Sequence, residues 1–198
     1  MSERPVSNPL ALAVLACLAE RPMHPYEMAS TMRERRKDEA IKLNYGSLYS
    51  VMEALCRNAF IVPKETIKDG KRPERTVFEL TAAGRHELLD WLSALLSEPA
   101  KEYTHFEAGL SLMPVLPPEE VLGLLRQRIE MIELELAKAR SVDAYTRAKH
   151  VPRLHTIERE FELGQREAEL AFVRRLAADI DSGRLEGIEE WRGWHAEA

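Results

Sequence analysis

Residues 61–80 interrupt a sequence whose pattern is otherwise helical. Ile61–Lys68 and Arg75–Leu80 are rich in β-branched and aromatic residues, and Asp69-Gly70 between them is a strong turn signal. The connection is longer than two residues and contains Pro73, so we expect an extended tip. The segment therefore predicts a β-hairpin within a mostly α-helical chain.

Three helices are expected before the hairpin. Asn8-Pro9 is typical of a helix start, and the residues that follow are apolar nearly all round, which predicts a buried helix. Pro25 begins a second helix, whose expected inward residues are Tyr26, Met28, Ala29 and Met32. A third helix begins near Asn44. Its predicted core stripe is Leu48, Val51, Met52 and Leu55, with Ser47, Ser50, Ala54 and Arg57 on the opposite side.

The chain after the hairpin predicts helices only. Thr81 is a candidate N-cap for a fourth helix, in which Leu88, Leu89, Trp91, Leu92, Leu95 and Leu96 supply apolar surface. A short helix is expected over about Phe106–Val115. Two long helices follow, one from Pro118 and one after Val151-Pro152. Their apolar rows are wider than one small bundle would bury, which favours a partner chain as cover.

Composition indicates a globular protein of one or two domains. Of the 198 residues, 45% are hydrophobic and 31% are charged, and no apolar run approaches the length of a membrane span. The start has no signal-peptide pattern, and both cysteines lie among apolar neighbours, so we expect a cytoplasmic protein without disulfides. Residues 1–85 hold 14 Lys and Arg against 11 Asp and Glu, whereas residues 86–198 hold 14 against 22. Two parts with different tasks are one interpretation, and chance variation is the other.

The sequence gives little support for an enzyme. His150 and His155 are five residues apart with Pro152 between them, which is the wrong spacing for two metal ligands on one helix face. Gly109–Met113 lacks the second glycine of a nucleophile elbow, and there is no glycine-rich phosphate loop. We therefore expect no catalytic residues, no metal and no cofactor.

The predicted order of helix, helix, helix, hairpin, helix is that of a winged helix-turn-helix domain. In this architecture the third helix enters the major groove of DNA and the hairpin lies along the phosphate backbone. Cations at the hairpin tip suit that place, because phosphates are bound by Lys and Arg. We expect a DNA-binding domain over residues 1–98 and a helical dimerisation domain over 99–198.

Three motifs carry a resemblance to a known family. MHPYEM, YGSLYSVMEAL and DGKRPERTVFELTAAGR, within the first 90 residues or so, resemble the PadR family of bacterial transcriptional regulators. The long C-terminal helices resemble its dimerisation region in layout only. One departure is Val77-Phe78, where many members have a pair of tyrosines, and this removes two hydroxyls from the wing.

The resemblance implies a dimeric repressor that binds a near-palindromic operator and is released by a small aromatic or lipophilic compound. It places Tyr45, Ser47, Tyr49 and Ser50 at or near the groove and Lys68, Lys71, Arg72 and Arg75 on phosphates. Our candidate effector-binding residues are Trp91, Tyr103 and Phe106. The identity of the effector does not follow from the family.

Several alternative interpretations remain at this point. Tyr45 and Tyr49 are also compatible with core packing, the wing cations with a solvated turn, and the cluster Arg33–Lys37 with an ordinary charged helix end. Trp91, Trp191 and Trp194 are more typical of core or interface residues than of ligand contacts. The competing function is a winged-helix adaptor that binds a protein partner and no DNA.

Overall fold

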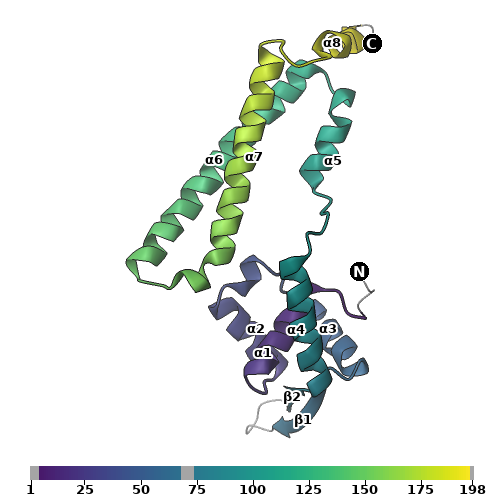
Figure 1. Ribbon diagram of the computed structural model, residues 1–198, viewed down its shortest axis with the longest axis vertical. Helices are drawn as coiled ribbons and strands as arrows, with labels where there is room; N and C mark the ends of the chain where they lie inside the picture. Colours follow the sequence, from purple (N-terminus) through teal and green to yellow (C-terminus); the bar gives the residue numbers. More distant parts are fainter. Residues whose placement is uncertain (1–4, 68–73, 197–198) are drawn as a thin grey trace. The chain divides into compact units, whose positions relative to one another are not determined.

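The computed structural model describes residues 5–67 and 74–196, which fall into two compact units, 1–101 and 102–198 (Figure 1). The fold is mostly helical with one antiparallel hairpin, as the sequence predicts. The N-terminal unit contains α1 (Pro9–Glu20), α2 (Pro25–Glu34), a 3-10 turn η1 (Lys37–Glu39), α3 (Tyr45–Arg57), β1 (Ile61–Ile67), β2 (Arg75–Leu80) and α4 (Ala82–Ser97).

Helix α1 is the centre of the N-terminal unit and packs against α2, α3, α4 and β2. It starts as predicted, because the Asn8 side chain accepts a hydrogen bond from the Leu10 N–H at 3.0 Å and Pro9 needs no such partner. Apolar residues on nearly all sides of α1 are buried. The predicted stripe of α3, from Leu48 to Leu55, and the residues Leu88 and Trp91 of α4 complete this core.

The hairpin is fixed at its base by both neighbouring segments. β1 and β2 pair antiparallel from Ile61 opposite Leu80 to Ile67 opposite Arg75, with a bulge between Pro63 and Glu65. On the edge of β2 that faces away from β1, Phe78 exchanges two backbone hydrogen bonds with Met23, at 3.0 and 3.1 Å. The hairpin base is therefore held to the connection between α1 and α2 as well as to the end of α3.

The second unit contains α5 (His105–Leu112), η2 (Met113–Val115), α6 (Pro118–Ala148), η3 (Arg153–His155), α7 (Ile157–Asp181) and α8 (Ile188–Ala196). Helices α6 and α7 lie antiparallel, side by side (Figure 1). Their contact buries Ile132, Leu136 and Leu170 in one cluster and Val121, Leu125 and Val173 in another. Helix α8, which was not expected from the sequence, adds Ile188 and Trp191 to the second cluster.

Helix α7 has two apolar stripes, on roughly opposite sides. Leu170, Val173 and Ala177 are buried against α6. Ile157, Phe161 and Phe172 belong to the other stripe, which is exposed, and the Phe161 side chain is 68% accessible. Within the described part of the chain, no helix is both long and apolar enough to cross a membrane.

Candidate nucleic-acid interface

Helix α3 turns a polar face to solvent. Its N-terminus is capped by Asn44, whose side-chain oxygen accepts from the Ser47 N–H at 2.7 Å. Directly opposite the buried stripe lie Gly46, Ser50, Glu53 and Arg57, and all four are exposed. A helix that presents small and polar groups on a free face can approach the edges of base pairs.

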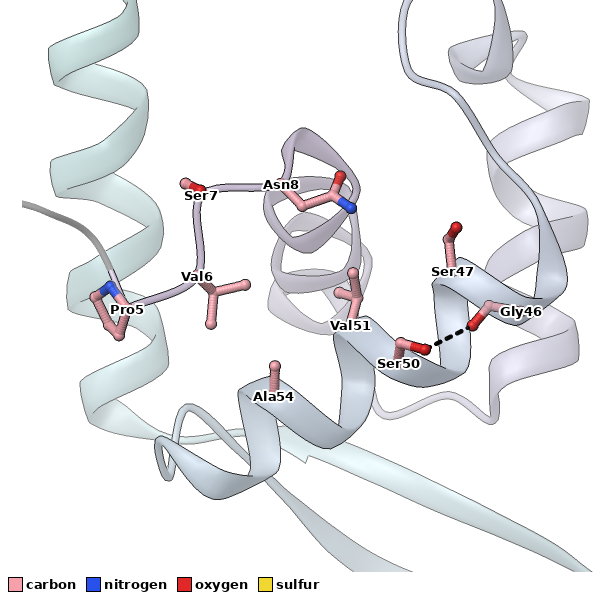
Figure 2. Close-up of a pocket in the computed structure, with 9 residues that line it drawn as sticks. All are labelled: Pro5, Val6, Ser7, Asn8, Gly46, Ser47, Ser50, Val51 and Ala54. Carbon is pink, nitrogen blue, oxygen red and sulfur yellow. Dashed lines mark hydrogen bonds between the residues drawn. The ribbon is translucent and has the colours of Figure 1, made fainter.

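One edge of this face lies beside the N-terminal segment, as Figure 2 shows. Val6 is buried in the core and fixes the segment there, so that an open groove separates the segment from α3. Ser47 and Ala54 are half-buried at this edge, which corrects our expectation that they lie fully opposite the core. The groove is lined by Pro5, Val6, Ser7, Asn8, Gly46, Ser47, Ser50, Val51 and Ala54.

The hydroxyl of Ser50 has a local partner. It donates a hydrogen bond to the Gly46 carbonyl at 3.1 Å, as Figure 2 shows, and this bond leaves its oxygen free to accept. Of the two α3 serines predicted to face DNA, Ser50 lies on the exposed face, whereas Ser47 lies on the edge beside the N-terminal segment. Contact with DNA stays a prediction for both residues.

The opposite edge of α3 carries aromatic residues. The Tyr45 and Tyr49 side chains are 42% and 54% exposed, so the alternative that they fill the core is wrong. Tyr26, expected to face inward, is instead 60% exposed. Its ring stacks on the Tyr45 ring, with centroids 6.3 Å apart and planes 11° from parallel. This contact between helices explains why an aromatic residue at the margin of the apolar stripe of α2 points outward.

Two arginines lie at the ends of the tyrosine stack. The guanidinium of Arg33 is 5.0 Å from the centroid of the Tyr45 ring and donates a hydrogen bond to its hydroxyl at 3.0 Å. That hydrogen bond raises the pKa of the Arg33 guanidinium. Arg75 of β2 lies 5.9 Å from the centroid of the Tyr26 ring. We call Arg75, Tyr26, Tyr45 and Arg33 the arginine–tyrosine row.

The cluster from Arg33 to Lys37 divides into different environments. Helix α2 ends at Glu34, and Arg35 makes a bidentate ion pair with Glu20 of α1. The hydrogen bond from Arg35 lowers the pKa of the Glu20 carboxyl. Arg36, with a positive φ of 55°, pairs with Glu39. Arg35 and Arg36 therefore have carboxylate partners in their own unit, which supports the interpretation of an ordinary charged helix end for these two residues.

One of the four predicted wing cations lies within the described residues. Lys68, Lys71 and Arg72 lie outside the described residues, whereas Arg75 is the first residue of β2. On the described part of the hairpin, Lys64 forms an ion pair with Glu79 at 3.2 Å. The predicted phosphate contacts of the four wing residues stay predictions.

The three candidate effector residues belong to different units. Trp91 is buried in the core of the N-terminal unit. Tyr103 is 85% exposed, and Phe106 packs under the guanidinium of Arg128, 3.7 Å from its ring centroid. That the three residues share a ligand stays a prediction.

Other chemistry-bearing residues are dispersed. Burial raises the pKa of both cysteine thiols, Cys17 and Cys56, which disfavours the reactive thiolate. Among residues 5–67 and 74–196, no group of three or more His, Cys, Asp or Glu side chains is arranged to hold a metal ion.

A trihelical core, an exposed third helix and an adjoining hairpin define a winged helix-turn-helix protein. Residues 14–90 match the transcriptional regulator PadR-like family, which agrees with the family that the sequence motifs predict. A comparison with curated proteins gave no match.

Solved structures extend the similarity of the fold beyond this segment. Bacillus subtilis PadR in complex with operator DNA shares 19% identity and a TM-score of 0.68, covering 87% of this chain and 99% of that chain. The same regulator with p-coumaric acid gives 17% identity, a TM-score of 0.67, and 87% and 98% coverage. The Vibrio cholerae virulence activator AphA shares 17% identity and a TM-score of 0.61, covering 87% of this chain and 98% of that chain. The fold of this chain is therefore that of PadR-like transcriptional regulators.

Proposed function

We propose that this protein is a dimeric DNA-binding transcriptional regulator that represses its target and is released by a small aromatic or lipophilic effector. The observation that carries the proposal is the exposed polar and aromatic face of α3 on a winged-helix fold, flanked by arginines from α2 and β2. The complex of Bacillus subtilis PadR with operator DNA supports a DNA-binding role for this fold.

In the proposed complex α3 lies in the major groove. Tyr45, Ser47, Tyr49 and Ser50 lie at or near base edges, whereas Lys68, Lys71, Arg72 and Arg75 bind phosphates. Base contacts of this kind supply specificity, and phosphate contacts supply most of the salt-dependent affinity. The excess of Lys and Arg over acids in residues 1–85 is consistent with that division.

Dimerisation is supported by apolar surface that the single chain leaves exposed. The second stripe of α7 includes Ile157 and Phe161, and Leu95 and Leu96 of α4 are 55% and 87% exposed. Exposed apolar side chains on each of these two helices are of the kind that commonly marks a protein interface. A two-fold dimer would separate two recognition helices by about one turn of DNA, roughly 34–36 Å, and would match a palindromic operator.

Effector release is supported by the neighbour that contains p-coumaric acid. We retain Trp91, Tyr103 and Phe106 as the candidate contacts, because aromatic side chains suit a planar apolar ligand. The ligand releases DNA only if it binds the DNA-free form more tightly than the bound form. As a regulator of bacterial genes, the protein would act in the cytoplasm.

A DNA-binding measurement in a salt series tests this function against the adaptor alternative. A labelled duplex from upstream of the protein's own gene and a duplex of mixed sequence are titrated side by side. Lys71→Ala should weaken both and flatten the log–log salt slope by about one unit. Ser50→Trp should weaken the upstream duplex more than the mixed one. Binding to neither duplex at low salt would favour the adaptor, and a reporter gene distinguishes repression from activation.

A further inference from the structure

The arginine–tyrosine row joins three elements of the N-terminal unit. Tyr26 belongs to the first turn of α2, Tyr45 is the first residue of α3, and Arg75 begins β2. Arg33, in the last turn of α2, lies at the far end of the stack. The row thus connects the recognition helix to the end of β2 nearest the wing tip, where Arg75 pairs with Ile67.

The burial of apolar area does not account for this arrangement, because both rings are substantially exposed. Among the described residues, neither Arg33 nor Arg75 has a carboxylate within ion-pair distance, whereas Arg35 and Arg36, close by in sequence, both do. The two guanidinium groups of the row therefore lie on aromatic faces and retain capacity for an anion.

The row also contains more hydrogen-bond donors than acceptors. Arg33 donates one N–H to the Tyr45 oxygen, which directs the proton of the Tyr45 hydroxyl to another acceptor. A guanidinium has five N–H donors, and within the described residues the guanidinium of Arg33 makes only this one hydrogen bond. Phosphate oxygens accept from guanidinium and hydroxyl groups together, with the planar geometry that arginine favours.

We propose that the arginine–tyrosine row is a phosphate-binding surface that holds the DNA backbone beside the N-terminus of α3, separately from the wing tip. This inference rests on the proposed function and adds Arg33 as a phosphate ligand and Tyr26 as a positioning residue. Tyr26 has no charge, and its role is to hold Arg75 and Tyr45 on its two sides.

The test uses the full-length protein and a fluorescent duplex of mixed sequence, with anisotropy measured over a KCl series. Arg33→Gln should flatten the log–log salt slope by about one unit and weaken binding roughly five-fold at 0.15 M salt. The matched control is Arg35→Gln, which removes the same charge two residues away from a guanidinium already paired with Glu20. Its slope should equal that of the parent.

Tyr26 separates positioning from charge. Tyr26→Leu should flatten the salt slope without any change of charge. Tyr26→Phe, which keeps the ring, should have the same slope as the parent. Thermal unfolding by circular dichroism confirms that each variant is folded. If the parent binds DNA and Arg33→Gln behaves as Arg35→Gln does, the phosphate-binding surface is wrong and the proposed function stands. If the folded parent binds no duplex, both are wrong.

Discussion

Gly84 lies so close to Phe60 that a β-carbon at position 84 would be 2.0 Å from the Phe60 carbonyl oxygen. The first turn of α4 is pressed against the start of the hairpin at this point. Thr81 makes the same junction from the other side, because its hydroxyl caps Gly84 at 3.0 Å and contacts the Ala59 carbonyl at 2.8 Å. The junction fixes the wing relative to α4.

We expect Gly84→Ala to destabilise the N-terminal unit by about 3 kcal/mol, because the clash is with backbone and cannot be relieved by a rotamer change. Chemical denaturation followed by circular dichroism measures this. Gly46→Ala is the control in the same unit, since its β-carbon would make only an ordinary contact of 3.7 Å. Equal stability of the two variants would contradict the close approach.

Glu53 is the acidic residue on the exposed face of α3. A carboxylate facing DNA is repelled by phosphates, but it can accept from the amino group of cytosine. Glu53→Gln should therefore raise affinity for mixed-sequence duplex several-fold while reducing the preference for operator, by about 1–3 kcal/mol if one base contact is lost. Parallel titrations of the two duplexes measure both effects. An unchanged preference would place Glu53 outside the base contacts.

Phe161 tests the proposed dimer. Its side chain is 68% exposed on the second stripe of α7, so Phe161→Glu should leave the fold intact. If this stripe is the interface, a charge buried there should weaken association at least ten-fold, about 1.4 kcal/mol. Sedimentation over a concentration series gives the constant. Ala178→Glu, an exposed position off the stripe, is the control and should behave as the parent does.

Trp91 provides a probe for the proposed effector. A planar aromatic acid titrated into the protein should quench tryptophan fluorescence and lower the affinity for operator over the same concentration range. Trp191 and Trp194 contribute background, so the quench should be lost in Trp91→Phe and retained in Trp194→Phe. Quenching without any change in operator affinity would reject effector release through this residue.

Local signals in the sequence predicted most of the N-terminal fold. The caps Asn8 and Thr81 and the stripe from Leu48 to Leu55 depend on residues within one or two turns, and all were confirmed. The prediction that Tyr26 faces inward was wrong. An amphipathic pattern does not distinguish a residue at its margin that packs into the core from one that stacks on an aromatic ring of another helix. The pairing of Arg33 with Tyr45, twelve residues apart, has no signature in either helix alone.

The C-terminal unit was less predictable. Helix α8 is only nine residues long and contains Gly193. Its position depends on tertiary contacts, in which the Trp191 indole donates to the Leu116 carbonyl at 2.9 Å. The width of the apolar rows on α7 was predicted, but only the structure shows which stripe packs against α6.

Pro63 has a consequence for how the protein behaves when crowded. The backbone N–H and C=O of Phe78 both point to Met23, away from β1. In an antiparallel pair the backbone groups of the opposite residue then also point away from the partner strand, so the backbone of Pro63 faces the outer side of β1. A strand added there would need an N–H that proline lacks, and the adjacent bulge would spoil its register. The outer edge of the hairpin is thereby protected against sheet extension between molecules, so concentrated protein should not aggregate through its wings.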